Sequence, residues 1–290
     1  MFLHASSICA VLLSLFWPWG AAQGVLSGGC FEAQTSLPDT LVVKSPALHC
    51  ADSVLVYSPF SASAARDLPT VILLHGWSGS PRNWAANMDI QGLSDEFGFR
   101  IICPDGFKDS WYMNKTDSTS MRWRDFFWDE LWPMIDSRYG LKADRVFTDG
   151  LSMGGHGAMN LFLDHPELMR GAGSMSGVLN LRNSGGSRVL IPPMLGVERI
   201  EDPVCDAQSA VNRIGRVVEI CGAGAASKLL IVSCGLQDKT FLPASHEFEA
   251  KAAEQGLRVI AQYTPGKHRW PFWCWALRCH LEWFRAELSR

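Results

Sequence analysis

The sequence predicts an α/β fold, a mostly parallel doubly wound sheet with helices on both of its faces. Short apolar segments of three to five residues recur along the chain, and nearly continuous apolar segments are typical of parallel strands buried on both faces. Helical segments separate them, and this alternation favours a doubly wound sheet over an all-α or all-β fold. A length of 290 residues is enough to bury one large core.

The individual elements follow from these patterns. Two β-type segments near Pro and Ser residues, 41–43 and 54–57, predict an N-terminal hairpin. Apolar segments predict five further strands, at 71–74, 100–103, 146–148, 229–232 and 259–263. Helices are predicted at 84–97, 126–139, 154–165, 246–255 and 273–288.

The mature chain is predicted to be a single domain, residues 23–290, because it contains no long linker and no internal repeat. The segment 181–228 departs from the alternation. It contains Gly185-Gly186, Pro192-Pro193 and Asp202-Pro203, which predict an irregular excursion. Ligands of such sheets bind at the carboxyl ends of the strands, so we expect this excursion to cover the site.

The charge balance argues against a nucleic-acid partner. The chain has 26 Lys and Arg against 29 Asp and Glu, a formal net charge of −3, and so lacks a basic excess. Its 47% hydrophobic content is too high for a disordered chain. The composition also excludes collagen-like, coiled-coil and multi-span membrane architectures.

The N-terminal segment is typical of a secretory signal peptide. No Lys, Arg, Asp or Glu precedes Glu32, and the apolar segment 8–19 is followed by small residues up to Ala22. About a dozen apolar residues are too few to span ~30 Å of hydrocarbon. We therefore expect cleavage after 1–22 and a secreted protein, extracellular or periplasmic, with no membrane span. A buried N-terminal helix and a lipoprotein anchor at Cys30 are the alternatives.

The cysteine count is consistent with export. Of nine cysteines, Cys9 lies in the predicted signal, and an even number remains: Cys30, Cys50, Cys103, Cys205, Cys221, Cys234, Cys274 and Cys279. An even count in an exported chain predicts disulfides without fixing their pairing. Cys103 and Cys234 end apolar strands, so both could instead be buried free thiols. The spacings match no zinc site. Asn114-Lys115-Thr116 is a glycosylation sequon, usable in a host that glycosylates.

A nucleophile elbow is the clearest catalytic motif. Gly150-Leu151-Ser152-Met153-Gly154 lies between the predicted strand 146–148 and the helix that follows. The elbow exposes the serine Oγ on a tight turn, and glycines two residues before and after avoid clashes with strand and helix. The following helix N-terminus stabilises a developing oxyanion. Ser152 is the predicted nucleophile; a plain glycine-rich turn would not explain the central serine.

An acid and a base follow in the order that this fold requires. The strand 229–232 leads to Asp238, and the turn after the last strand carries His268. The serine needs a histidine base, which an acid orients. Weaker candidates for these roles are the histidines His156, His165, His246 and His280 and the acids Asp202, Asp206 and Glu219.

Two backbone donors are predicted to form an oxyanion hole. The N–H of Met153, which follows the nucleophile, is one. The other is the N–H of Trp77, in the loop His75-Gly76-Trp77 after an early strand. The alternative for this loop is a simple surface turn.

Six motifs together resemble the esterase D-like family. They are His75-Gly76-Trp77-Ser78-Gly79, Cys103-Pro104-Asp105-Gly106, Ser110-Trp111-Tyr112, Gly150-Leu151-Ser152-Met153-Gly154-Gly155-His156-Gly157, Gly173-Ser174-Met175-Ser176-Gly177 and Gly266-Lys267-His268-Arg269-Trp270. That family includes S-formylglutathione hydrolases, feruloyl and acetylxylan esterases of carbohydrate esterase family 1 type, and mycobacterial mycolyltransferases.

The resemblance spans roughly 40–288 and implies an α/β-hydrolase fold. It also implies the roles given above to Ser152, Asp238, His268, Trp77 and Met153. The acyl-transfer mechanism that follows from these roles needs no metal or organic cofactor.

The expected function is a secreted serine esterase that forms an acyl-enzyme. Export favours extracellular substrates, such as feruloyl or acetyl esters of polysaccharides or related small esters. Trp111, Tyr112 and Trp270 lie near the expected site loops and are candidate substrate-binding residues, with core packing as the alternative. Alternative functions are an acyltransferase of mycolyltransferase type, an S-formylglutathione hydrolase-like thioesterase and a non-catalytic secreted binding protein. A peptidase is possible in principle, but the resemblance favours esters.

Overall fold

The computed structural model describes residues 38–116, 120–183 and 186–290. They belong to one compact unit, Leu37–Arg290. The predicted signal peptide, 1–22, and Cys30 lie outside the described residues. Among the residues described, no helix combines the length and apolar character needed to cross a membrane.

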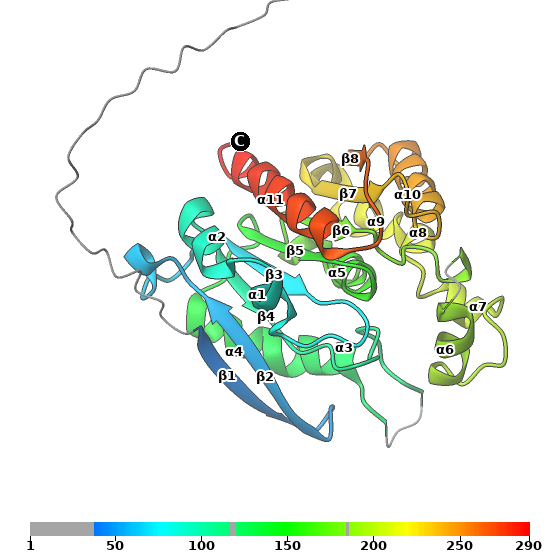
Figure 1. Cartoon of the computed structure of the whole chain (residues 1–290), viewed down its shortest axis with the longest axis horizontal. Helices are drawn as coiled ribbons and strands as arrows, with labels where there is room; N and C mark the ends of the chain where they lie inside the picture. The colour runs from blue at the N-terminus through cyan, green and yellow to red at the C-terminus, as the bar shows by residue number, and fades with distance from the viewer. Residues whose placement is uncertain (1–37, 117–119, 184–185) are drawn as a thin grey trace, which may run out of the picture. The chain divides into compact units, whose positions relative to one another are not determined.

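An eight-stranded, mostly parallel sheet forms the centre of this unit, as predicted (Figure 1). The strand order is β1-β2-β4-β3-β5-β6-β7-β8. Only β1 and β2 are antiparallel to their neighbours. The strands are β1 (Asp39–Ser45), β2 (Cys50–Tyr57), β3 (Thr70–Leu74), β4 (Arg100–Cys103), β5 (Val146–Gly150), β6 (Gly171–Met175), β7 (Leu229–Gly235) and β8 (Arg258–Thr264).

The hairpin and the five later strands that the sequence predicts are all present. Strands β3 to β7 are buried along their whole length, which explains the apolar segments that predicted β3, β4 and β7. The sequence analysis missed β6, because Gly171 and Gly173 give it a low strand propensity. A side chain at Gly171 would collide with the backbone of Leu229 on β7. Here close packing between strands selects glycine.

Helices cover both faces of the sheet (Figure 1). One face carries α1 (Asn83–Asn87), α2 (Ile90–Phe97) and α11 (Trp270–Glu287). On the other face lie α3 (Trp123–Asp125), the π-helix η2 (Phe126–Leu131), α4 (Trp132–Tyr139), α5 (Met153–Asp164) and α10 (Leu242–Glu254). Two single 3-10 turns, η1 (Phe60–Ala62) and η3 (Pro166–Leu168), lie in the connections.

The helix predicted at 84–97 is divided in two. Met88 is extended, with φ −159° and ψ 160°, and ends α1. The side chain of Asp89 then caps α2 by accepting a hydrogen bond from the N–H of Gly92. The capping residue therefore starts a new helix inside an apolar pattern that is continuous in sequence.

The prediction that 181–228 is irregular is wrong for its described part. That part forms short helices: η4 (Leu181–Asn183), α6 (Ser187–Met194), α7 (Pro203–Asp206), α8 (Ala210–Arg213), α9 (Arg216–Cys221) and η5 (Gly222–Ser227). The prolines do not prevent helix formation. Pro203 occupies the first position of α7, where proline is tolerated, and Asp202 caps that helix.

The seven cysteines of the described chain are free thiols, so the expected disulfides are not found among these residues. Cys103 and Cys234 match the alternative interpretation, since both are buried free thiols. Cys103 ends β4 and Cys234 is the penultimate residue of β7, and β3, β5 and β6 separate these two strands. At about 4.8 Å per strand, this separation is far beyond disulfide reach. Burial raises the pKa of the Cys234 thiol to about 12.

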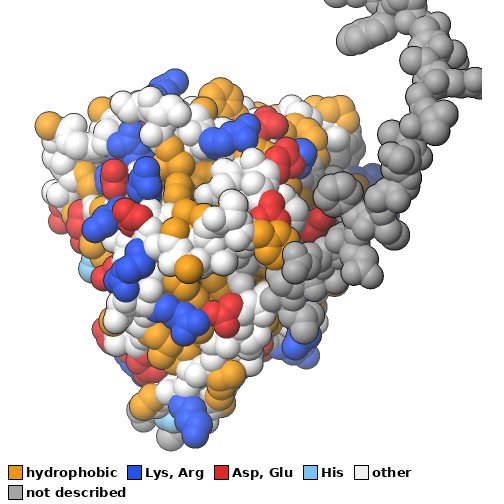
Figure 2. Space-filling model, turned by 90° about the vertical axis from the view of Figure 1, so that its left-hand side faces the viewer, with side chains coloured by type: hydrophobic (Ala, Val, Ile, Leu, Met, Phe, Trp, Pro, Cys, Tyr) orange, Lys and Arg blue, Asp and Glu red, His pale blue; other side chains and the backbone are white. Residues whose placement is uncertain are grey.

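Charged side chains of both signs are interspersed on the face shown in Figure 2, with hydrophobic side chains between them. That face therefore carries no broad patch of one sign, in keeping with the small net charge.

We predict that Gly157→Ala destabilises the protein, although alanine is the better helix former. A Cβ at this position of α5 would lie 2.6 Å from Cγ of Tyr112, whose ring is buried against Trp123. Such overpacking should lower the free energy of unfolding by about 1–3 kcal/mol, measured by urea denaturation. Gly215→Ala is the control, because its Cβ would meet no atom closer than 3.8 Å. Equal stability of Gly157→Ala and the wild type would contradict this account.

Candidate active site

Ser152 lies at the sharp turn between β5 and α5, with φ 54° and ψ −117°. A positive φ is strained for a residue with a side chain. The flanking glycines allow the turn to close. A Cβ at Gly150 would lie 2.5 Å from the carbonyl oxygen of Gly154, and a Cβ at Gly154 would lie 2.6 Å from that of His75. The N–H of Ser152 donates to the carbonyl of Met175 on β6 over 2.9 Å, which holds the turn against the neighbouring strand.

The structure brings together the three side chains that the sequence analysis selected. Nε2 of His268 lies 2.9 Å from Oγ of Ser152. Nδ1 of His268 lies 2.7 Å from Oδ2 of Asp238, whose side chain is only 3% exposed. The three residues follow the carboxyl ends of β5, β7 and β8, where parallel strands place their functional residues.

Packing and loop hydrogen bonds fix His268 in this position. The ring of Phe241 lies 4.5 Å from the imidazole, and that of Trp273 meets it edge-on at 4.8 Å. The loops after β7 and β8 are joined because Gln237 donates its N–H to the carbonyl of Gly266. His268 and Asp238 therefore belong to two loops that are held as one unit.

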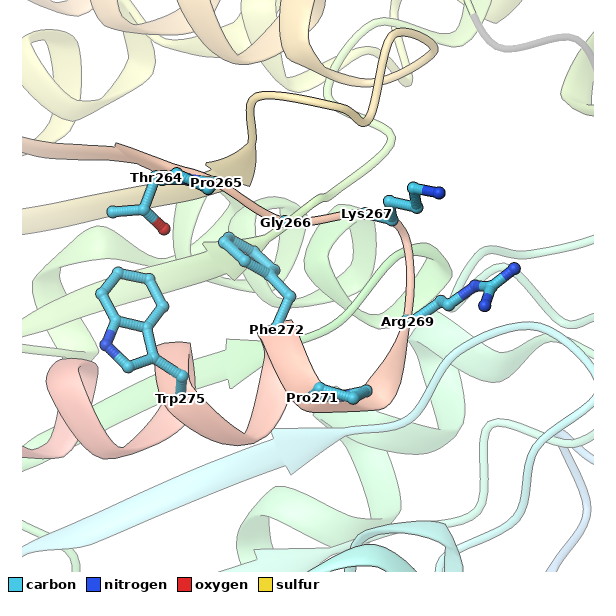
Figure 3. A pocket seen from close by; sticks show the side chains of 8 residues that line it. All are labelled: Thr264, Pro265, Gly266, Lys267, Arg269, Pro271, Phe272 and Trp275. Atoms are coloured by element: carbon cyan, nitrogen blue, oxygen red, sulfur yellow. The ribbon is translucent and has the colours of Figure 1, made fainter.

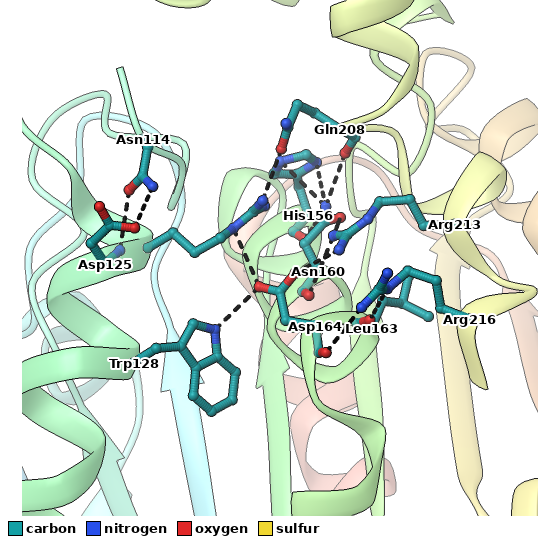
Figure 4. A network of polar contacts seen from close by, with 11 residues as sticks. Asn114, Asp125, Trp128, His156, Asn160, Leu163, Asp164, Gln208, Arg213 and Arg216 are labelled. Atoms are coloured by element: carbon teal, nitrogen blue, oxygen red, sulfur yellow. Dashed lines mark hydrogen bonds and ion pairs between the residues drawn. The ribbon is translucent and has the colours of Figure 1, made fainter. Parts of the chain in front are cut away.

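The competing histidines have other partners. Burial lowers the pKa of His156 to about 3, and its Nδ1 lies 3.1 Å from the carbonyl of Val178. Figure 4 shows this imidazole beside Asn160, within a network that also joins Arg213 to Asp164. The other three histidines pair as His165 with Glu167, His246 with Glu249 and His280 with Asp149.

The competing acids also lie outside this site. Asp202 caps α7, Asp206 pairs with Arg182, and Glu219 is exposed on α9. Asn114 of the sequon donates its amide Nδ2 to Asp125 over 2.6 Å (Figure 4). Glycosylation of this asparagine would have to break that hydrogen bond. Modification at Asn114 stays a prediction.

The two predicted oxyanion donors lie on either side of Ser152, in α5 and in the loop after β3. Met153 is the first residue of α5, and its N–H is one of the helix's free terminal donors. Gly76 and Trp77 line the same cavity as Ser152. Within the described chain, neither the N–H of Met153 nor that of Trp77 donates to a protein acceptor. Both are therefore available to a substrate oxygen.

Buried polar contacts hold the loop that carries Trp77. Nε2 of His75 lies 2.8 Å from the backbone N of Gly106 and 3.2 Å from Oδ1 of Asp105. Nδ1 of the same ring lies 2.8 Å from the carbonyl oxygen of Gly76. The hydroxyl of Tyr112 donates to the carbonyl of His75 over 2.7 Å. Sequence reasoning missed this role of His75, because the motif gives no sign of what the imidazole touches.

A buried carboxyl group, that of Asp52, contacts the backbone of the loop that holds His75. Oδ1 of Asp52 on β2 accepts from the N–H of Asp105 over 3.2 Å. Burial, with a smaller contribution from the neighbouring Asp105 charge, raises the pKa of Asp52 to about 8. The surroundings of Asp52 therefore favour the neutral, protonated carboxyl group.

Two of the three predicted substrate-binding residues do not reach the cavity. Tyr112 is 1% exposed and Trp111 5% exposed, and neither lines the space beside Ser152. Trp111 packs edge-on against His156 at 6.1 Å, and Tyr112 holds His75. Their large aromatic surfaces are used for packing, which corrects their expected role as direct contacts.

The third, Trp270, does line the cavity, which has a volume of about 340 Å³. Two more indoles, of Trp77 and Trp273, line it as well. The remaining lining residues are Gly76, Ser78, Gly79, Asn83, Leu151, Ser152 and His268. Contrary to expectation, the described part of 181–228 contributes none of them: the lining residues found come from 76–83, 151–152 and 268–273.

A second cavity, of about 480 Å³, lies against the loop that carries His268 (Figure 3). Its lining includes Lys267 and Arg269, whereas His268 and Trp270 line the first cavity. The chain turns between these residues, since the N–H of Arg269 donates to the carbonyl of Lys267 over 2.7 Å and α11 begins at Trp270. Figure 3 shows both cationic side chains extending away from Trp275. Ser152 is not part of this second lining, so the cavity is separate from the triad.

No group of three or more His, Cys, Asp or Glu side chains in the described part of the chain is arranged to hold a metal ion.

Known proteins share this sequence pattern and fold. Residues 45–284 match the family described as "Putative esterase". An acetyl esterase of Caldicellulosiruptor saccharolyticus is 22% identical, over 76% of this chain and 84% of its own length. An S-formylglutathione hydrolase of Arabidopsis thaliana is 23% identical, over 77% and 83%. Among solved structures, a ferulic acid esterase superposes with a TM-score of 0.72 at 21% identity, covering 86% of this chain and 97% of its own.

The structural likeness establishes the α/β-hydrolase fold, and the family match covers most of the chain. The protein therefore belongs to the putative esterase family and is a carboxylic ester hydrolase.

Proposed function

We propose that this protein is a secreted serine esterase that uses Ser152, His268 and Asp238 as a catalytic triad. The observation that carries the proposal is the continuous hydrogen-bonded chain from Oγ of Ser152 through His268 to Asp238, at the wall of an open cavity. Secretion is part of the proposal because the segment 1–22 has the composition of a signal peptide.

The geometry supports a two-step acyl transfer. Nε2 of His268 removes the Oγ proton as Ser152 attacks the ester carbonyl, and Asp238 stabilises the imidazolium that forms. The imidazolium then protonates the departing alcohol, which leaves an acyl group on Ser152. Water, deprotonated by the same imidazole, hydrolyses this acyl-enzyme and restores the serine.

The N–H groups of Trp77 and Met153 are proposed to bind the oxyanion of each tetrahedral intermediate. They gain strength from the positive end of α5, because the helix dipole points at the reacting oxygen. Such donors stabilise the transition state more than the planar ester, which is what accelerates the reaction.

The cavity supports a small or flat acyl group. Its volume of about 340 Å³ lies at the lower end of ligand sites. The indoles of Trp77, Trp270 and Trp273 offer flat apolar faces to an aromatic acyl chain or to a sugar ring. Feruloyl and acetyl esters of polysaccharides, or related small esters, fit this lining, and the structural similarity to a ferulic acid esterase supports the first of these.

A second candidate is thioester hydrolysis of the S-formylglutathione type. The similarity to the Arabidopsis hydrolase over 77% of this chain favours it. The same triad would act on either substrate, so a panel of acetyl, butyryl and feruloyl esters together with S-formylglutathione separates the two. A higher kcat/KM for the thioester would favour this second candidate. If an added acceptor alcohol receives the acyl group faster than water does, the protein is instead an acyltransferase.

Ser152→Ala should abolish turnover of every ester in that panel, by about 10⁴-fold or more, because Oγ of Ser152 is the hydroxyl that contacts Nε2 of His268. The free energy of unfolding should change by no more than about 1 kcal/mol, since only one hydroxyl is lost. A fluorophosphonate should label the wild type once per chain, at Ser152, and should not label the variant. Labelling of the variant at another serine would place the nucleophile elsewhere.

Hydrolysis should decline as the pH is lowered, because a protonated His268 cannot accept the Oγ proton. The measurement is kcat/KM against pH for one neutral ester, with circular dichroism to show that the protein stays folded. A rate independent of pH down to about pH 4 would exclude a histidine base.

Trp77→Ala should reduce kcat/KM for feruloyl esters about tenfold relative to acetyl esters, because one aromatic contact of about 1–1.5 kcal/mol is lost. The backbone N–H of residue 77 is retained, and the half-exposed side chain contributes little to the core. Trp283→Ala on α11 is the matched control, because Trp283 is similarly exposed but does not line the cavity. Equal losses for both esters would show that the indole does not contact the acyl group.

A further inference from the structure

A second chain of aspartate, histidine and serine lies inside the molecule, between the sheet and α11. Nδ1 of His280 lies 2.8 Å from Oδ2 of Asp149. Nε2 of the same ring lies 2.7 Å from Oγ of Ser233, whose hydroxyl donates to the side-chain oxygen of Gln262 over 3.0 Å. Asp149, His280 and Ser233 are 0% exposed. We call these three residues the buried cluster.

The buried cluster repeats the order of contacts found at Ser152 but cannot act on a substrate. None of its three members lines either cavity described above. Complete burial also keeps water and ester away from Oγ of Ser233. The cluster therefore acts, if at all, through the strands and the helix that its hydrogen bonds connect.

Each member of the buried cluster lies on an element that carries part of the triad. Asp149 lies on β5, three residues before Ser152. Ser233 lies on β7, five residues before Asp238. His280 lies on α11, which begins two residues after His268. The cluster thus connects the supports of all three triad residues.

The connection reaches the nucleophile elbow directly. Oδ1 of Asp149 accepts the N–H of Gly150 over 2.8 Å, and Gly150 opens the turn that holds Ser152. One carboxylate thereby joins the base of the elbow to α11 through His280.

A glycine on the strand in between makes this bridge possible. Strand β6 separates β5 from β7. A Cβ at Gly173 on β6 would lie 2.6 Å from Nδ1 of His280. The absence of a side chain there leaves room for the imidazole to lie between Asp149 and Ser233.

We propose that Asp149, His280 and Ser233 are positioning residues for ester hydrolysis. By joining β5, β7 and α11 beneath the site, they keep Ser152, Asp238 and His268 within hydrogen-bond distance of one another. A small relative shift of these elements would lengthen the contact between Ser152 and His268, and catalysis is sensitive to such misplacement. This inference rests on the proposed triad.

The test uses Ser233→Ala, which removes one buried hydroxyl, and His280→Asn, which keeps an amide donor where Nδ1 lies. Active sites are titrated with a fluorophosphonate, so that kcat refers to folded, reactive enzyme. We expect kcat for a small acetyl ester to fall about 10–100-fold, with KM changed less than twofold. His280→Leu, which retains neither hydrogen bond, should lose more kcat than His280→Asn.

Two controls separate positioning from a general loss of stability. Ser94→Ala also removes a buried hydroxyl, one that donates to the carbonyl of Phe99, away from the triad. Glu287→Gln weakens the ion pairs of Glu287 with Arg170 and Arg258, at the other end of α11. Both should leave kcat per titrated site unchanged, even if they lower the melting temperature.

Unchanged kcat in Ser233→Ala and His280→Asn, or equal losses in Ser94→Ala and Glu287→Gln, would overturn the positioning role. Neither result would affect the proposed function, which is tested separately by the activity and labelling of Ser152→Ala and by the pH profile.

Discussion

The strained backbone at Ser152 is the constraint on which the site depends. A residue with φ 54° between a strand and a helix costs about 1–3 kcal/mol and persists only where the surroundings enforce it. Gly150 and Gly154 allow the turn to close without collisions, and β6 holds it through the carbonyl of Met175. The parallel register of β3, β5 and β6 therefore decides where Ser152 lies, and the rest of the site is arranged around that position.

Hydrogen bonds between buried polar groups hold the other parts of the site in place relative to Ser152. His75 and Tyr112 hold the loop of Trp77 from one side. The buried cluster of Asp149, His280 and Ser233 joins β5, β7 and α11, the elements next to Ser152, Asp238 and His268. Hydrogen bonds are strong in such dry surroundings, and an unpaired member is costly, so each network favours one arrangement. The proposed triad is thus supported by polar groups that do not line the cavity beside Ser152.

Much of the fold and the site was predictable from local sequence. Apolar segments and their alternation with helices predicted the sheet, because a strand buried on both faces needs apolar residues throughout. The pattern failed at β6, where packing against Leu229 requires glycine, and at Met88, where the cap of Asp89 interrupts an apolar helix pattern. At β6 a contact between strands, and at Met88 a capping hydrogen bond, outweighed the local propensity of the sequence.

The sequence by itself determined the candidates for the site: Ser152 from its glycines, and Asp238 and His268 from their places after late strands. These are properties of a few adjacent residues, so chain order is enough to find them. Only the tertiary structure decided which tryptophans face the cavity, that Tyr112 supports His75, and that His280 pairs with Asp149 inside the protein. Such contacts join residues 37 to 131 positions apart, and their geometry depends on how the sheet and helices pack, which no local pattern encodes.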